Sequence, residues 1–175
     1  MENLILEKAK KIKLLLLDVD GVLTDGRIIY DSAGRDLKLF DVHDGLGVYL
    51  LKKAGIPTIL VTAKGSKTIK PRAKDMKVDA VFANISPKSA VLEGILKKYK
   101  VGLEEICFIG DDLVDLCMIK RVGLAVAVNN ACEEIKKAAA YITVKRGGRG
   151  AVREVVEIIL KSQGKWEDAV SAYNV

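Results

Sequence analysis

The segment LLLLDVDGVLTDG, residues 14–26, places two carboxylates, Asp18 and Asp20, directly after an apolar run. In an extended backbone, side chains two positions apart leave the same face, so these carboxylates are expected to lie close together where a strand ends. Carboxylates at this spacing repel each other unless a cation compensates their charge. Oxygen ligands without histidine or thiolate favour Mg²⁺, although they do not distinguish it from Mn²⁺ or Co²⁺. Two carboxylates delivered in this way indicate a metal site.

Three further groups of polar residues also follow apolar runs. Thr62 ends the run ILVT, and Lys88 opens the segment KSAVLEGIL after DAVFANI. The run ICFIG is followed by three acids, Asp111, Asp112 and Asp115. Open parallel sheets bind ligands beyond the carboxyl ends of their strands, so we expect these groups to converge on the first pair. A hydroxyl can donate to a phosphoryl oxygen and an ammonium can neutralise it, which favours phosphoryl transfer.

The elements that must position these groups are visible as six short apolar runs. The runs are KLLLLDVD, IPTILVTA, DAVFANI, EEICFIGDD, GLAVAV and AYITV. Each is apolar on both faces, as a sheet covered on both sides requires. Segments with helical patterning lie between the runs, so strands and helices alternate. We predict an α/β fold, a doubly wound and mostly parallel sheet with helices on both faces, in a single domain of residues 1–175.

Glycines are expected to end several helices. Gly55, Gly102 and Gly123 each follow a helical segment at the position of a left-handed C-cap. Residues 26–40 break the alternation, because two β-rich arms flank DSAGRD and predict a small inserted β-hairpin. The last amphipathic helix is followed by residues 165–175, which are less periodic and are expected to form a C-terminal tail.

Composition limits the function classes. The net charge is +6, but lysines and glutamates are interleaved and only 5% of residues are aromatic, which argues against a nucleic-acid partner. A preference for small anionic ligands accounts for the charge equally well. No apolar stretch is long enough for a membrane span and no secretory signal is evident, so we expect a cytoplasmic protein without a membrane partner. Cys107, Cys117 and Cys132 lack disulfide or zinc spacing and are interpreted as packing residues.

The four groups resemble, in order, the four motifs of the haloacid dehalogenase-like phosphohydrolases. The motifs are DVDGVLTDG, the isolated Thr62, Lys88 and GDDLVD. More narrowly, DGRIIYDSAGRDLKLFDVHDGLGVYLLKKAGI and GGRGAVREVVEIILKSQGKW resemble the 3-deoxy-D-manno-octulosonate 8-phosphate phosphatases, from about Leu14 to Trp166. This resemblance implies a Mg²⁺-dependent phosphatase of lipopolysaccharide sugar synthesis that releases the free sugar acid and phosphate. It also implies a hairpin in place of a large cap domain, and a homotetramer in which one subunit's hairpin helps to close its neighbour's site.

The resemblance implies roles for individual residues. Asp18 is expected to be the nucleophile that becomes a phosphoaspartate, and Asp20 the acid and then the base. The Asp18 carboxylate, the Asp20 backbone carbonyl and Asp111 are expected to hold Mg²⁺. Lys88 and Thr62 are expected to bind the phosphoryl group.

The remaining candidate residues surround this centre. Asp112 and Asp115 are expected to orient Lys88 or a metal-bound water. The family pattern after the motif threonine is glycine and arginine, whereas this chain has Ala63 and Lys64, which keep the charge at the substrate site but not the bidentate geometry. The stretch KRGGRGA predicts a phosphate or sugar-carboxylate contact by Arg149 or by the arginine three positions before it.

Other functions fit the sequence less well than hydrolysis does. A response-regulator receiver uses similar residues, but its paired acids come at the first strand and its acceptor aspartate comes later. A non-catalytic phosphate-binding module would tolerate loss of Asp18 or Asp20, and both are present. A phosphomutase needs a larger cap to exclude water. Among substrates, another sugar phosphate such as a sialic acid 9-phosphate stays open. The single His43 has no second histidine with which to form a site.

Overall fold

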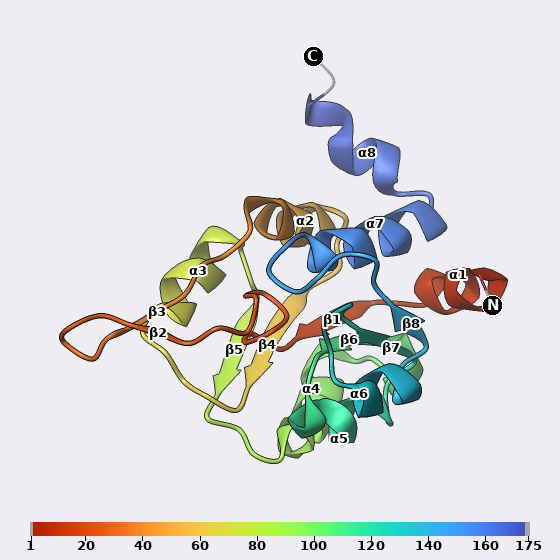
Figure 1. Ribbon diagram of the computed structural model, residues 1–175. Coiled ribbons are helices and arrows are strands. Elements are labelled where there is room, and N and C mark those ends of the chain that lie inside the picture. The colour runs from red at the N-terminus through yellow and green to blue at the C-terminus, as the bar shows by residue number, and fades with distance from the viewer. Residues whose placement is uncertain (1, 174–175) are drawn as a thin grey trace.

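The computed structural model describes residues 2–173, and its centre is a sheet of six parallel strands (Figure 1). Adjacent strands are all parallel, with Leu17 of the first strand opposite both Leu60 and Ile109. In spatial order the strands are β5 (Ala80–Ala83), β4 (Thr58–Thr62), β1 (Leu14–Leu17), β6 (Ile106–Gly110), β7 (Leu124–Ala127) and β8 (Tyr141–Ile142). This order confirms the predicted fold class.

The strands form where the apolar runs lie because both faces of the sheet are covered. Every residue of β1, β4, β6 and β7 is buried. Continuous apolar runs are the pattern of strands buried on both sides, whereas alternating patterns belong to sheets with one wet face. The carboxyl ends of these strands are therefore held rigidly by the core.

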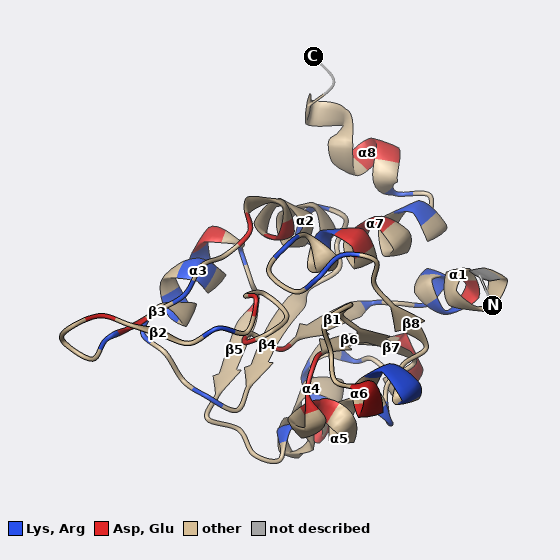
Figure 2. Cartoon of the chain, viewed as in Figure 1, with Lys and Arg blue, Asp and Glu red and all other residues tan. Residues whose placement is uncertain are grey.

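Helices cover the two faces in separate layers. Figure 1 shows α1, α2, α3 and α7 on one face and α4, α5 and α6 on the other. The helices are α1 (Glu2–Lys10), α2 (Val42–Lys53), α3 (Ile69–Asp75), α4 (Leu92–Tyr99), α5 (Leu116–Ile119), α6 (Glu133–Ala138), α7 (Ala151–Ser162) and α8 (Trp166–Val170). Short 3₁₀ helices lie at Lys88–Val91, Leu103–Glu105, Leu113–Asp115 and Ser171–Tyr173. Helices α1, α3, α6 and α7 each carry both acidic and basic residues (Figure 2). Among the described residues, no helix combines the length and the apolar character that crossing a membrane requires.

Both ends of the described chain are more ordered than the sequence indicates. The N-terminal helix α1 was not predicted, and it packs on the core through Ile5 and Ala9. The expected tail is instead helical in α8 and the 3₁₀ helix after it, with Ala169 buried. Trp166 anchors this segment, because two cations of α7 lie over its ring. Arg153 Cζ is 5.1 Å and Lys161 Nζ is 5.0 Å from the ring centre. Residues 174–175 of the predicted tail lie outside the described part of the chain.

Only one of the three predicted glycine caps has the expected geometry. Gly55 follows α2 with φ +80°, as a left-handed C-cap requires. Helix α4 ends instead at Lys100, with φ +53°, so the prediction for Gly102 was wrong. Gly123 does not have a positive φ; a Cβ there would lie 2.2 Å from the backbone oxygen of Glu104, so this glycine is required by close packing.

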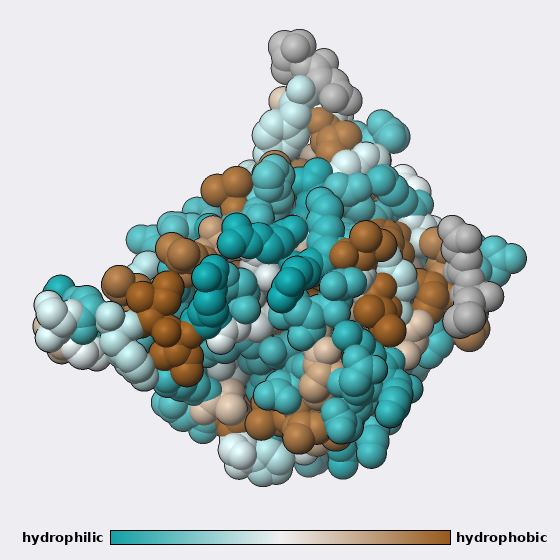
Figure 3. All heavy atoms as spheres, in the orientation of Figure 1, coloured by the Kyte–Doolittle hydropathy of each residue, from teal (hydrophilic) through white to brown (hydrophobic). Residues whose placement is uncertain are grey.

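The predicted hairpin is present as a separate two-stranded ribbon. Strands β2 (Ile29–Tyr30) and β3 (Asp36–Leu37) are antiparallel and do not join the main sheet. Figure 1 shows the ribbon projecting from the body, and Figure 3 shows hydrophobic surface where the two meet. Its apolar side chains are largely exposed: Ile28, Ile29, Tyr30, Leu37 and Leu39. The predicted apolar residue Phe40 differs, because it is partly buried and packs against the core.

Candidate active site

The polar groups meet at the point where the strand order reverses. From β1 the chain proceeds to β4 and β5 on one side, and then returns to β6 on the other side of β1. Asp18 directly follows β1 and Asp111 directly follows β6, so the two lie on neighbouring strands at the same edge. A backbone hydrogen bond of 3.1 Å from Asp18 N to Ile109 O extends the pairing into the site. Crevices at such reversal points are the usual ligand sites of open parallel sheets.

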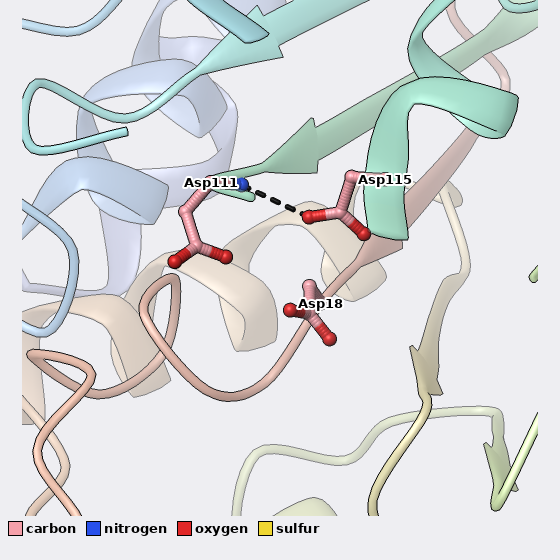
Figure 4. A group of neighbouring side chains, drawn as sticks. All are labelled: Asp18, Asp111 and Asp115. Atoms are coloured by element: carbon pink, nitrogen blue, oxygen red, sulfur yellow. Dashed lines mark hydrogen bonds between the residues drawn. The ribbon is translucent and has the colours of Figure 1, made fainter. Parts of the chain in front are cut away.

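Three carboxylates form the centre of the site (Figure 4). Asp18, Asp111 and Asp115 each offer an oxygen, and these oxygens lie within 4.8 Å of one another. Asp115 is anchored because its Oδ2 accepts a hydrogen bond of 2.9 Å from the Asp111 backbone N. Gly21 leaves the space that Asp111 occupies, since a Cβ there would lie 1.9 Å from Asp111 Oδ2. Gly21 also has φ +87°, a conformation that side chains rarely adopt.

A buried lysine lies against the same carboxylates. Lys88 Nζ is 2.5 Å from Asp115 Oδ1, to which it donates a hydrogen bond, and 2.6 Å from Asp18 Oδ1. The second contact is an ion pair whose geometry is not that of a hydrogen bond, so Asp18 Oδ1 is buried without a hydrogen-bond partner. The side chain of Lys88 is 1% exposed, and charged groups are buried to this degree only when they are paired. Lys88 therefore fixes Asp18 in place.

Burial and crowding shift the protonation of these groups. Burial, followed by repulsion from Asp115, raises the pKa of Asp18 to about 6 despite Lys88. Burial and repulsion from Asp18 raise the pKa of Asp111 to about 8. Burial alone would lower the pKa of Lys88, but its two ion pairs outweigh that effect and raise it. Without a further cation, the site holds more negative charge than Lys88 compensates.

These residues fit a hard divalent cation. Three carboxylates face one ammonium, all ligand atoms are oxygens, and one oxygen of Asp18 lacks a hydrogen bond. Mg²⁺ favours one or two carboxylates together with phosphate and water oxygens. Asp18 and Asp111, the two predicted carboxylate ligands, lie together as required. Asp115, expected to act outside the metal ligands, is engaged with Lys88 and the Asp111 backbone, which suits a positioning role.

Asp20 stands apart from this cluster. Its side chain is 31% exposed and forms an ion pair with Lys38 of the hairpin arm. The carboxylate cluster therefore does not include Asp20, and a role for its backbone carbonyl in metal binding stays a prediction. Lys38 was not among the predicted site residues, because its approach to Asp20 depends on how the hairpin folds back.

The predicted phosphate-binding residues lie at the end of β4. Thr62 is buried, and its Oγ1 donates to Lys64 O at 3.1 Å and accepts from Lys64 N at 3.3 Å. Ala63 and Lys64 are exposed. Lys64 reaches the hairpin, where its Nζ donates to the Tyr30 hydroxyl at 3.3 Å. Lys64 thus links the end of β4 to the hairpin.

Two other predicted residues lie further out. Asp112 is exposed and accepts a hydrogen bond of 2.8 Å from Leu113 N, so it caps a 3₁₀ helix and does not contact Lys88. Arg149 is 65% exposed, with its Nη2 3.8 Å from Asp25 Oδ2. A contact between Arg149 and an anion remains a prediction.

The glycine-rich loop before α7 packs against the turn that carries the first acidic pair. Gly148 N donates to Val22 O at 2.9 Å, and a Cβ on Gly147 would lie 1.7 Å from Gly21 O. These glycines permit the close approach that was expected of them. The group that approaches them is the backbone of the turn after β1. Asn130 Oδ1 accepts from Gly147 N at 2.7 Å and also holds the loop.

Asp44 is a buried acid that the sequence reasoning missed. Its oxygens accept from Gly150 N at 3.2 Å and Arg153 N at 2.9 Å, which joins α2 to the start of α7. Burial raises the pKa of Asp44 to about 6. Asp44 lies in the motif FDVHDG beside His43, an exposed residue that contacts Asp41.

A carboxylate and lysine site at the reversal point of a parallel sheet is the arrangement of the haloacid dehalogenase-like hydrolases. A family model of that description matches residues 72–155. The 3-deoxy-D-manno-octulosonate 8-phosphate phosphatase of Escherichia coli K12 is 37% identical over 165 residues, 94% of this chain and 88% of that protein. The chain belongs to this family of phosphatases within the haloacid dehalogenase-like hydrolases.

Solved structures agree with this assignment. The 3-deoxy-D-manno-octulosonate 8-phosphate phosphatase of Moraxella catarrhalis, in complex with magnesium, phosphate and KDO, is 41% identical and aligns with a TM-score of 0.95 over 99% of both chains. The cobalt-bound phosphatase of Haemophilus influenzae is 36% identical, with a TM-score of 0.86 over 90% of this chain and 92% of that one.

Proposed function

We propose that this protein is a Mg²⁺-dependent phosphatase that hydrolyses 3-deoxy-D-manno-octulosonate 8-phosphate to the free sugar acid and phosphate, in lipopolysaccharide sugar synthesis. The observation that carries the proposal is the buried cluster in which Lys88 holds Asp18 beside Asp111 and Asp115. The family assignment, at 37% and 41% identity over nearly the whole chain, supports this substrate.

In the first half of the reaction, Asp18 attacks phosphorus. An oxygen of its carboxylate forms a bond to phosphorus while the bond from phosphorus to the sugar oxygen breaks. Asp20 gives a proton to that oxygen, so the sugar leaves as an alcohol. Lys88 and the Thr62 hydroxyl stabilise the charge on the phosphoryl oxygens during this transfer.

In the second half, water attacks the phosphorus of the phosphoaspartate. Asp20, now a carboxylate, accepts a proton from the water, and the bond from Asp18 to phosphorus breaks. Phosphate leaves and both aspartates return to their starting states. The separate placement of Asp20, outside the buried cluster, suits a group that exchanges protons with substrate and water.

Asp18, Asp111 and the Asp20 backbone carbonyl would hold Mg²⁺, and the ion would neutralise the carboxylates and polarise the phosphoryl group when bound. The donor set of carboxylate oxygens beside one ammonium fits this ion. Relatives with bound magnesium or cobalt support a divalent metal.

Substrate recognition is assigned to the rim of the site. Lys64 and Arg149 are exposed cations suited to the carboxylate or phosphate of a sugar acid phosphate. Lys64 contacts the hairpin residue Tyr30, and Arg149 lies 3.8 Å from Asp25. Ala63 leaves room beside the phosphoryl group. Asp112 is left with a capping role, while Asp115 orients Lys88.

Assembly and location are part of the same proposal. The exposed apolar hairpin, residues 26–40, fits a homotetramer in which each hairpin helps to close a neighbouring site. The three cysteines are free thiols, which suits the reducing cytoplasm.

A panel of sugar phosphates assayed with Mg²⁺ tests the proposal. We expect the highest kcat/KM for 3-deoxy-D-manno-octulosonate 8-phosphate. A higher value for a sialic acid 9-phosphate would contradict the substrate assignment. Binding of these esters without any hydrolysis would favour a non-catalytic module instead.

A further inference from the structure

In the hairpin arm that carries β3, apolar side chains are exposed to solvent and the charged side chain between them is buried. Leu37 and Leu39 are 47% and 65% exposed, whereas the side chain of Lys38 between them is 7% exposed. Side chains alternate along an extended arm, so turning the leucines outward turns Lys38 toward the body. A lysine is rarely buried unless its charge is paired.

The partner of Lys38 is Asp20. Its ammonium contacts Asp20 Oδ1, and it also lies 3.9 Å from Asp36 Oδ2, a buried oxygen without a hydrogen-bond partner. Lys38 is therefore held between a carboxylate of its own hairpin and the carboxylate two residues after Asp18. The ion pair occupies one oxygen of Asp20 and leaves Oδ2 available to a substrate.

We propose that Lys38 is a positioning residue for the acid and base function of Asp20, an inference that rests on the proposed function. The ion pair restricts the orientation of the Asp20 side chain. When Asp20 gives its proton to the leaving sugar oxygen, the carboxylate that forms is stabilised by the adjacent ammonium. Through Lys38, the position of the hairpin also governs the orientation of Asp20.

This role predicts a dependence on the leaving group. The alkoxy group of an alkyl phosphate leaves as an alkoxide unless its oxygen is protonated. The p-nitrophenolate of p-nitrophenyl phosphate, by contrast, leaves readily without a proton. The ratio kcat/KM covers the steps up to loss of the leaving group, so it reports on this proton transfer. Lys38→Met should lower kcat/KM for the sugar phosphate about 10- to 100-fold, a part of the roughly 10²- to 10⁴-fold that acid–base catalysis contributes, because Asp20 itself is retained. For p-nitrophenyl phosphate the loss should be below about threefold.

Two further variants make the test specific. Lys38→Arg should restore most of the activity toward the sugar phosphate, since it keeps the cation, and Lys38→Gln should not. Lys52→Met removes an exposed lysine ion pair with Asp79, remote from the site, and should leave both substrates unaffected. Light scattering on each variant checks that the assembly is that of the parent protein. Should Lys38→Met fail to fold, the comparison of Lys38→Arg with Lys38→Gln supplies the same contrast.

Equal losses on both substrates, or no loss on either, would overturn the inference. A parent protein that hydrolyses neither ester would instead contradict the proposed function, so the two failures are distinguishable.

Discussion

Lys88 is one buried cation beside three carboxylates, those of Asp18, Asp111 and Asp115. At the scale of residues, this imbalance explains both the position of the groups and their chemistry. A single ammonium orders Asp18 for attack, while the remaining negative charge favours a metal ion. The same charge makes the metal-free site unfavourable when all of its acids are ionised.

The raised pKa values of Asp18, about 6, and Asp111, about 8, predict a pH-dependent stability. The unfolded chain has aspartate pKa values near about 4, so the folded state binds more protons between about pH 4 and 8. The stability that this proton binding contributes is present at low pH and is lost as pH rises through the folded pKa values. The melting temperature of metal-free protein, compared with that of Asp111→Asn, measures this loss.

The two proteins should melt most alike at about pH 4 and below, where Asp111 is protonated in both the folded and the unfolded state, and Asp111→Asn should melt higher near about pH 9, where Asp111 is ionised. Mg²⁺ should raise the melting temperature of the parent protein at high pH and do so less for the variant, because it binds the ionised carboxylate. A difference between the two proteins that does not change with pH would contradict this account.

Residue types at strand ends were predictable, but their partners were not. Asp18, Thr62 and Asp111 were placed correctly because parallel strands bring their carboxyl ends together. Which of the acids after Asp111 would meet Lys88 depended on a single turn of 3₁₀ helix, which directs Asp115 inward and Asp112 outward. No local pattern in the sequence carries that information.

At the scale of elements, the glycine-rich loop before α7 locks the turn after β1. A Cβ on Gly147 would lie 1.7 Å from Gly21 O, and backbone cannot move aside as a flexible side chain can. Gly147→Ala should therefore destabilise the protein by about 1–3 kcal/mol and reduce activity, because the turn carries Asp20. Denaturant unfolding and steady-state assays measure the two effects.

Gly94 is the matched control for this prediction. It lies within α4, and a Cβ there would meet nothing within 4 Å. Gly94→Ala should stabilise the protein by up to about 1 kcal/mol and leave activity unchanged, since alanine lowers the entropy of the unfolded chain. If both variants gave the same change in unfolding free energy, the loop would not lock the turn.

The elements that were missed are those that depend on tertiary contacts. Helix α1 packs Ala9 into the core, and α8 is anchored by Trp166 between two cations of α7. Short helices are marginal on their own, so their sequences carry weak signals and packing decides whether they form. The long buried runs of the sheet, by contrast, were evident because they must be apolar on both faces.

At the scale of the whole molecule, the hairpin shapes the surface. Its outward side chains include Leu37 and Leu39, and a two-stranded ribbon cannot bury them alone. We therefore expect light scattering to give the mass of a tetramer. Leu39→Lys should weaken the assembly, because a charge would enter an apolar interface. Leu4→Lys, at an exposed apolar site of α1, is the control and should leave the mass unchanged.

A parent protein with the mass of one chain would contradict the proposed assembly. A fully active monomeric Leu39→Lys variant would show that the neighbouring hairpin is not needed at the site. Either result would leave the buried cluster of Asp18 and Lys88 to be tested separately.

The most direct test of the central claim is to identify the residue that becomes an acyl phosphate, which is expected to be Asp18. Borohydride reduces an acyl phosphate to an alcohol, so protein quenched during turnover of 3-deoxy-D-manno-octulosonate 8-phosphate with Mg²⁺ should carry homoserine at position 18. Peptide mass spectrometry identifies the site, and Asp18→Asn, inactive by about 10³-fold or more, should show no such product. The account predicts reduction at Asp18 alone. Reduction at another residue such as Asp20, or at none, would contradict it.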